Sequence, residues 1–322
     1  MRATICAAQG LTHADASVAV RLAATGRWQV RVAAPEKGAF TESEHLYGLL
    51  GRAPGVALVP PDKQPDADVL FARLGVGYPV PTRVARVVGI VGDEFAGPRA
   101  AVSILRRTVR QARRCDAILA ESRGLFWNPF RGWKRVVRFE PSVHPDFWLR
   151  AELAKRISEP PPAGQRSVRL MFAGSITPEA RLRVLREVEA ALAGLPAAQV
   201  FWRVYGSGVP AEPLSQTAYL DALDAADFVL APPGWLPWTH RLAEAASRQT
   251  VPIVDEREGR AFGLQDGVSA VLVHGDWAGA VRRALEMPRE GLRKMRQALA
   301  GLTVERLTPA AAAARLCRQL RI

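Results

Sequence analysis

Cysteine, lysine and long apolar runs are all scarce in this sequence of 322 residues. The three cysteines, Cys6, Cys115 and Cys317, are odd in number and far apart, which excludes a disulfide framework and a zinc cluster and favours a reducing compartment. No run approaches the roughly 18 apolar residues of a membrane-spanning helix. The first apolar segment also turns polar at Gln9 and Gly10, too early for a signal peptide. We therefore expect a soluble, cytoplasmic protein.

Positive charge dominates the composition. Lysine and arginine number 44 against 31 acidic residues, which gives a formal net charge of +13. This balance favours an anionic partner, such as a nucleic acid, acidic lipid or phosphorylated ligand. Arginines cluster at 106–114 and at 282–321. Each cluster could contact an anionic partner, or it could simply be the solvated face of a helix. A hydrophobic content of 48% is typical of a folded protein and excludes a wholly disordered one.

Apolar runs alternate with helical patterns along the whole chain, which predicts an α/β protein with parallel sheets. The length suggests about two domains, and the Pro-rich segment 158–164 is the predicted hinge. We expect an N-terminal acceptor domain (1–158), a C-terminal donor domain (165–304) and a last helix (305–322) that packs back on the N-terminal domain. Strands are expected at 3–8, 28–34, 68–74, 86–91, 116–120, 135–139, 167–173, 199–205, 227–231, 251–254 and 269–273.

The stretch 219–255 holds the residues with the clearest chemistry. A predicted strand ends near Pro233 and Gly234, and a helix opens near Thr239, whose side chain suits an N-cap. The unpaired N–H groups of a helix start attract phosphate, and a bound anion would offset the unfavourable placement of Arg241 in the first turn. Glu244 shares its helix face with Arg241 and could bind a ribose diol. A surface Arg–Glu pair is the alternative.

Two other predicted strands of this half end in small residues. One ends at Gly174 and Ser175, and another ends at Tyr205 and Gly206. Glycines there would let a ligand approach the backbone closely. We expect these residues to line a donor site in the crevice between the two domains, at the carboxyl ends of the strands.

In order and spacing, this half resembles the C-terminal signature of exostosin-family glycosyltransferases. The matching elements are Tyr219, Leu223, Phe228, Leu230, Pro232, Gly234, Thr239, Arg241, Glu244-Ala245 and Pro252-Ile253, with Leu170-Met-Phe-Ala-Gly174 upstream, followed by Arg181 and Arg183. The likeness covers residues 165–275. It implies a GT-B architecture, in which two Rossmann-like domains face each other across a cleft, and inverting transfer of a sugar from a nucleotide donor, with uridine diphosphate (UDP) as the expected nucleotide. It also implies that Arg241 binds the diphosphate and Glu244 the ribose.

The resemblance has two limits. Pro233 stands where the family usually carries a basic or polar residue, and the N-terminal half matches no motif, so the acceptor and the base do not carry over. An inverting displacement needs a side chain that takes the acceptor proton. Asp93 and Asp15, in loops that follow predicted strands, are the first choices, with His13 behind. The alternatives are that Asp15 caps a helix and that Asp93 lies in a turn.

The expected reaction is metal-independent and uses no cofactor besides the nucleotide-sugar co-substrate. Asp66-Ala-Asp68 precedes a predicted strand, so we interpret it as a turn and not as a metal motif. The expected partners are a saccharide or lipid-linked glycan acceptor for surface polysaccharide synthesis and, through the basic helix 106–114, the inner membrane face.

Three alternatives stay open at this point. A retaining GT-B enzyme would carry a second glutamate eight positions before Glu244, where Leu236 stands. A non-catalytic glycosyltransferase-like subunit is the second. A nucleic-acid-binding protein is the third, although the basic residues lack interleaved aromatics, so we expect no nucleic acid partner.

Overall fold

The computed structural model describes residues 1–7, 9–38, 43–61, 67–75, 84–91, 100–120, 135–138, 145–159, 161, 166–176, 179–193, 196–206, 209, 211–234 and 240–322. The chain forms two compact units. Unit 1 comprises Met1–Ala151 and Thr308–Ile322, and unit 2 comprises Glu152–Leu307. Among the described helices, none combines the length and the apolar character that crossing a bilayer requires.

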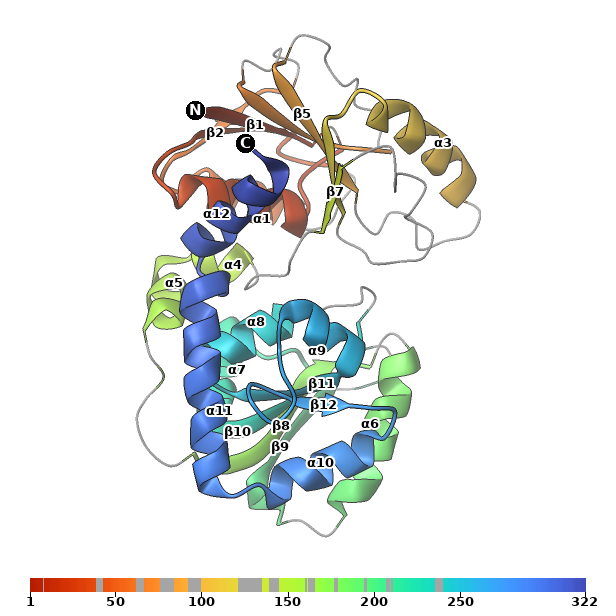
Figure 1. Cartoon of the computed structure of the whole chain (residues 1–322), viewed down its shortest axis with the longest axis vertical. Helices are drawn as coiled ribbons and strands as arrows, with labels where there is room; N and C mark the ends of the chain where they lie inside the picture. Colours follow the sequence, from red (N-terminus) through yellow and green to blue (C-terminus); the bar gives the residue numbers. More distant parts are fainter. Residues whose placement is uncertain are drawn as a thin grey trace. The chain divides into compact units, whose positions relative to one another are not determined.

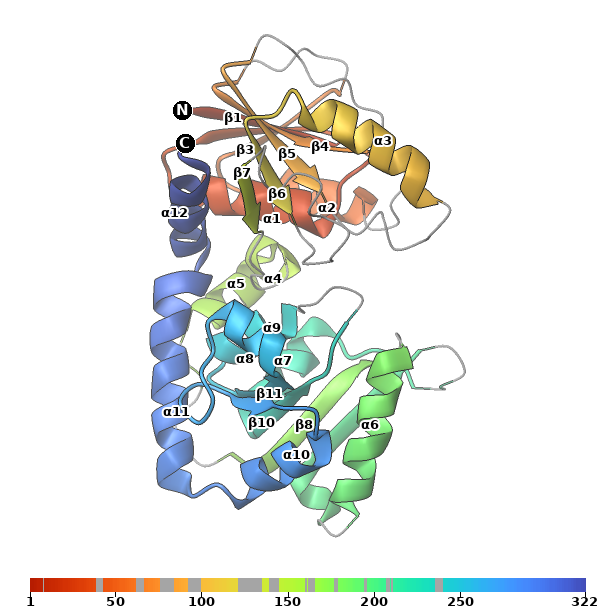
Figure 2. The same ribbon diagram turned by 45° about the vertical axis from the view of Figure 1, so that its right-hand side comes forward.

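Unit 1 is built on a parallel sheet with the strand order β3-β2-β1-β4-β5-β6-β7. Helices α1, α2 and α12 lie on one face of this sheet and α3 lies on the other (Figures 1 and 2). The strands are β1 (Arg2–Cys6), β2 (Gln29–Ala33), β3 (Val56–Val59), β4 (Val69–Arg73), β5 (Arg86–Val91), β6 (Ala117–Ala120) and β7 (Arg135–Arg138). The helices are α1 (His13–Ala23), α2 (Ser43–Leu50), α3 (Ala100–Ala112), α4 (Pro145–Leu149) and α12 (Pro309–Leu320).

Apolar side chains cover both faces of the unit 1 sheet. In β4, Phe71 joins a buried cluster with Leu22 of α1 and Leu46 of α2. The preceding residue, Leu70, belongs to a second cluster that includes Ala112 of α3. Successive strand residues point to opposite faces, so a continuous apolar run supplies a core on each side.

Unit 2 has a smaller parallel sheet with the order β12-β11-β10-β8-β9. Helices α6 and α10 cover one face, and α7, α8 and α11 cover the other (Figure 2). The strands are β8 (Val168–Ser175), β9 (Val200–Tyr205), β10 (Ala226–Ala231), β11 (Val251–Asp255) and β12 (Val271–Val273). The helices are α5 (Ala151–Ser158), α6 (Glu179–Leu192), α7 (Gln216–Ala225), α8 (His240–Ser247), α9 (Glu256–Phe262), α10 (Trp277–Glu286) and α11 (Arg289–Leu302), with short turns η2 (Ala197–Gln199) and η3 (Thr303–Leu307). The predicted architecture of two α/β domains with parallel sheets is confirmed.

Buried polar contacts explain why α5, which we expected in the N-terminal domain, groups with unit 2. Arg248 is 2% exposed, and its Nε donates to Oδ1 of Asp224 at 2.7 Å. Its Nη1 donates to the carbonyl oxygens of Arg156 and Glu159, the latter at 2.9 Å. Arg156 in turn pairs with Asp224 at 2.7 Å. The end of α5 is therefore hydrogen-bonded to the body of unit 2.

Candidate functional site

The strand order of unit 2 changes direction at β8, because β9 follows on one side of it and β10 lies on the other. Ligands of doubly wound sheets bind outside the carboxyl ends of the strands at such a point. Gly174 and Ser175 end β8 there, and Tyr205 ends β9 directly opposite Ser175. Pro233 and Gly234 follow the end of β10. Five of the predicted donor-binding residues thus share one edge of the sheet.

Arg241, in the first turn of α8, reaches the end of β8. Its Nη2 donates to the carbonyl oxygen of Ala173 at 2.8 Å, and its Cζ lies 5.1 Å from the centre of the Phe172 ring. Gly174 makes this approach possible, because a Cβ at that position would lie 2.5 Å from Nη2. Nε and Nη1 are buried and have no partner with full hydrogen-bond geometry within the part of the chain that the structure describes, although the Tyr219 hydroxyl lies within reach of the guanidinium. Buried donors left over in this way are suited to an anionic ligand.

Arg181 of α6 brings a second cation to the same edge. Its Nε donates to the carbonyl oxygen of Pro233 at 3.2 Å and its Nη1 to that of Ser175 at 3.1 Å. Burial, and then the nearby charge of Arg241, lowers the pKa of Arg181 from 12.5 to about 10. Two partly buried cations that repel each other favour the binding of a negative charge beside them. An anion bound at this edge would offset that repulsion.

Arg181 belongs to the residues that resemble the exostosin signature, but the resemblance assigns it no role. The signal that points to it is its place in the first turn of the helix that follows the Gly174 strand end. Its hydrogen bonds reach the backbone of two strand ends that are far apart in the sequence. A sequence pattern does not show that these two strand ends lie close to Arg181 in space.

Glu244 lies one turn along α8 from Arg241 and is 6% exposed, so the alternative of a surface Arg–Glu pair does not apply. Tyr219 of α7 lies beside both side chains. Burial, and then the charge of Glu244, raises the pKa of Tyr219, whereas Arg241 acts in the opposite direction. The Tyr219 hydroxyl lies within hydrogen-bonding reach of both side chains, although among the described residues neither contact has full hydrogen-bond geometry. The predicted pair Arg241 and Glu244 is thus held together inside unit 2.

Gly206 extends the edge beyond β9. Its φ of 127° lies in a backbone region that favours glycine. A Cβ at Gly206 would lie 3.3 Å from Oγ of Ser175, so the glycine lets the ends of β8 and β9 approach each other. Thr239, the predicted N-cap, and the two nearby tryptophans, Trp235 and Trp238, lie outside the described residues.

Unit 1 has its own switch point, between β1 and β4. Asp15 lies there, but its carboxylate is fully engaged. It accepts from the backbone N of Thr12 at 3.0 Å, from the Thr12 hydroxyl at 2.9 Å and from Nε of Arg73 at 3.2 Å. Asp15 is 0% exposed and Arg73 is 1% exposed. Thr12 is the N-cap of α1 and Asp15 completes its capping box, which is a structural role.

His13 is the first residue of α1 and is half-buried, adjacent to that capping box. Asp93 lies outside the described residues. Asp68 lies at the amino end of β4, where it accepts from the backbone N of Arg2 at 2.8 Å; Asp66 lies outside the described residues. This placement fits the interpretation of a turn. The described residues contain no group of three His, Cys, Asp or Glu placed to hold a metal ion.

Comparison of the sequence with protein-family models gives no match, and comparison with curated proteins gives none either. Solved structures do match. WaaG, a glycosyltransferase involved in lipopolysaccharide biosynthesis, has a TM-score of 0.53 at 14% identity, covering 97% of this chain and 99% of WaaG. HepE from Anabaena, in complex with UDP and glucose, has a TM-score of 0.55 at 12% identity, covering 100% of this chain and 99% of HepE.

TarM from S. aureus, in complex with fondaparinux, alpha-GlcNAc-glycerol and UDP, has a TM-score of 0.54 at 9% identity. The match covers 79% of this chain but only 55% of TarM, so this chain spans about half the length of that relative. At such low identity these likenesses show the fold alone. They do not single out the exostosin family. Each of the two units has the parallel α/β fold found in GT-B proteins such as these.

Proposed function

We propose that this protein transfers a sugar from a nucleoside diphosphate to a saccharide or lipid-linked glycan acceptor. The pair of guanidinium groups of Arg181 and Arg241, at the switch point of the unit 2 sheet, carries the proposal. The buried Nε and Nη1 of Arg241 would turn from the nearby Tyr219 hydroxyl to donate to the diphosphate, and Glu244 would bind the ribose. The GT-B fold and the resemblance of residues 165–275 to exostosin enzymes support the same function. UDP is the proposed nucleotide because HepE and TarM are described in complex with it.

The two arginines also supply a reason for a reaction that needs no metal. As the bond to the sugar breaks, negative charge develops on the departing diphosphate, and donors already aimed at that position stabilise it. The loss of one such donor typically lowers kcat about 10² to 10³-fold. We expect activity that survives EDTA and requires no cofactor besides the nucleotide-sugar. Activity that EDTA removes and a divalent cation restores would contradict this part of the proposal.

The acceptor hydroxyl must lose its proton to a base, and the carboxyl edge of the unit 1 sheet is where we place it. Asp15 is not carried forward, because its ion pair with Arg73 is fully buried. Asp93 and His13 are the two proposed groups. Removal of the true base by Asp93→Asn or His13→Gln should lower kcat about 10² to 10⁴-fold and leave UDP affinity unchanged.

We propose inversion at the anomeric carbon, because Leu236 stands where a retaining enzyme carries its second glutamate. Retention is the second candidate, favoured by TarM, which is described with alpha-GlcNAc-glycerol. The proton NMR spectrum of the first product made from an α-linked donor separates the two. A β-linked product supports inversion, and an α-linked product supports retention.

The experiment that tests the function measures UDP release from a panel of UDP-sugars, with and without candidate acceptors. We expect release by the wild type and by Arg183→Gln, because Arg183 lies exposed on the same helix as Arg181. Arg241→Gln should abolish release. UDP binding with no turnover of any donor would instead support the non-catalytic alternative, and the absence of nucleotide binding would overturn the proposal.

The basic helix α3 supports a membrane-facing location. Its region exposes five arginines, whereas Thr108 on the same helix is buried. The five are Arg106, Arg107, Arg110, Arg113 and Arg114. Each basic residue near an anionic bilayer contributes about 1 kcal/mol of attraction. Sedimentation with phosphatidylglycerol vesicles should therefore recover the wild type, but not a variant with these arginines changed to glutamate. Equal recovery of the two would refute the membrane contact.

A further inference from the structure

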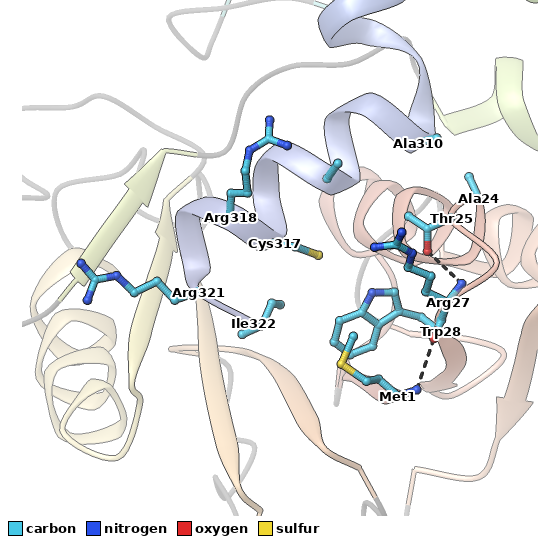
Figure 3. Close-up of a pocket in the computed structure, with 11 residues that line it drawn as sticks. Met1, Ala24, Thr25, Arg27, Trp28, Ala310, Cys317, Arg318, Arg321 and Ile322 are labelled. Carbon is cyan, nitrogen blue, oxygen red and sulfur yellow. Dashed lines mark hydrogen bonds between the residues drawn. The ribbon is translucent and has the colours of Figure 1, made fainter.

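Unit 1 contains a pocket of about 500 Å³ at the edge of its sheet where β1 and β2 begin. The carboxyl ends of the strands lie at the opposite end of the sheet. None of the residues proposed to bind the sugar donor or to act as the catalytic base lines this pocket. One wall is the loop between α1 and β2 together with the first residue, and the other wall is α12. The two walls face each other in Figure 3 and come together where the Cys317 thiol meets the Trp28 indole. The lining residues are Met1, Ala24, Thr25, Arg27, Trp28, Ala310, Ala314, Cys317, Arg318, Arg321 and Ile322.

The inner surface of this pocket is mainly apolar. Trp28 is only 5% exposed and belongs to the core, so it contributes a small, fixed part of the pocket floor. Cys317 is half-buried, and burial raises the pKa of its thiol, which therefore stays neutral at physiological pH. Ala310 and Ala314 lie one turn apart on α12, and their small side chains leave the space that larger residues would fill.

The charged groups around the pocket are cationic. Arg27, Arg318 and Arg321 line it, and no Asp or Glu side chain does. Within the described residues, none of the three guanidinium groups forms an ion pair. In Figure 3, Arg27 reaches from its loop toward α12, whereas Arg321 points away from the space. Arg27 is thus the arginine that reaches toward the opposite wall, while Arg318 lines the pocket from α12.

We propose that this pocket binds a small anionic amphiphile, with an aromatic or acyl body and one phosphate, sulfonate or carboxylate group. The body would lie on Trp28 and between the loop and Ala314, and the anion would pair with Arg27 and Arg318. Mostly apolar pockets of 300–1,000 Å³ with a few convergent polar groups are typical of small-molecule sites. Guanidinium groups also suit phosphate and carboxylate geometry.

A matched pair of fluorescent probes tests the charge and the body separately. Anilinonaphthalene sulfonate carries the anion, and N-phenylnaphthylamine has nearly the same body without it. We expect one equivalent of the sulfonate to bind the wild type, and the double variant Arg27→Ala/Arg318→Ala to bind it at least about tenfold more weakly. Both arginines are exposed, so the variant should fold as the wild type does. Arg52→Ala, which removes an exposed arginine elsewhere in unit 1, is the control and should bind normally. The neutral probe should not distinguish the variants.

Cys317 provides a second readout on the unmodified chain. Cys6 and Cys115 are each 1% exposed, so iodoacetamide should label Cys317 first. The sulfonate should slow this labelling, and saturating UDP should change neither the labelling nor the binding. Equal affinity of the double variant and the wild type, displacement of the sulfonate by UDP, or unprotected Cys317 would each overturn the proposal. None of these readouts involves the donor site. A negative result for this pocket therefore does not affect the glycosyltransferase proposal, and a negative result for that proposal does not affect this one.

Discussion

Replacement of Arg241 by glutamine separates a ligand-binding role of this residue from a purely structural one, because the two roles predict different effects on stability. Glutamine keeps an N–H that can donate to the carbonyl oxygen of Ala173, but it removes the charge. In the wild type, two nitrogens of the guanidinium are buried without a partner of full hydrogen-bond geometry in the described part of the chain, and its charge lowers the pKa of Arg181. If Arg241 serves an anionic ligand, the ligand-free variant should be as stable as the wild type or more stable. If it serves the fold, the free energy of unfolding should fall.

The effect on binding follows from these two buried donors. A hydrogen bond to a charged group contributes about 1.5–3 kcal/mol, so the loss of two costs at least about 3 kcal/mol. That loss is roughly a hundredfold in Kd. At a UDP concentration of about 100 times the wild-type Kd, binding stabilises the wild type by about 2.7 kcal/mol and the variant by only about 0.4 kcal/mol. Since 1 kcal/mol shifts Tm by roughly 2–4 °C in a domain of this size, the UDP-induced rise should shrink from roughly 5–11 °C to about 1 °C.

Differential scanning fluorimetry with and without UDP measures both quantities in one experiment. Arg183→Gln is the matched control, because it removes an exposed arginine from the helix that carries Arg181. The control should keep the full UDP shift. An undiminished UDP shift in Arg241→Gln would refute the placement of the donor site. A large loss of stability in the ligand-free variant would refute the argument that the two cations repel each other.

Three further predictions rest on single contacts. Gly174→Ala should weaken UDP binding about as much as the loss of the Arg241 charge, because the added methyl group would lie 2.5 Å from Nη2 of Arg241. Calorimetric titration with UDP measures this effect, and an unchanged affinity would contradict the prediction. Asp15→Ala should lower the free energy of unfolding by about 3–5 kcal/mol, because it leaves Arg73 buried without its carboxylate. Urea unfolding measures this change. A variant that is as stable as the wild type but inactive would instead indicate a catalytic role for Asp15. Burial raises the pKa of the Cys317 thiol above its usual 9.0. The stability that the neutral thiol contributes is therefore present below pH 9 and is lost as the pH rises through the higher pKa of the folded protein. Urea unfolding from pH 8 to 10 should show this loss in the wild type but not in Cys317→Ser, and identical pH profiles of the two would contradict it.

The regular elements could largely be predicted from the sequence. The strand expected at 86–91 coincides with β5, and the expected order of strands and helices matches the parallel sheets of both units. No element was expected at β3, α2, α4, α5 or α9. β3 lies at the edge of its sheet with half-exposed side chains, so it needs no continuous apolar run. α9 begins at the residue after β11, with Asp255 as its N-cap, and no turn signal separates the two.

The candidate site could be predicted only in part. Arg241, Glu244 and the glycines were found because they are close together in the sequence or end apolar strands. Arg181 was named in the resemblance without a role, since its partners are carbonyl oxygens of two other segments. Asp15 was interpreted as a possible base because nothing near it in the sequence shows that Arg73, 58 residues away, neutralises it. Sequence reasoning identifies groups able to ionise but not the groups that they face.

The sequence by itself determined the class of this protein: an α/β chain with two parallel sheets, whose second half carries polar and small residues at the strand ends. This works because burial on both faces of a sheet, and on one face of each helix, imposes a periodicity that is visible in a linear chain. Only the tertiary structure decided which charges are neutralised and which are left for a ligand. Arg248 and Arg73 are buried against carboxylates, whereas Arg181 and Arg241 are held beside each other at the end of β8. Those pairings depend on distances across strands and helices, and electrostatic energy follows distance in space, not separation along the chain.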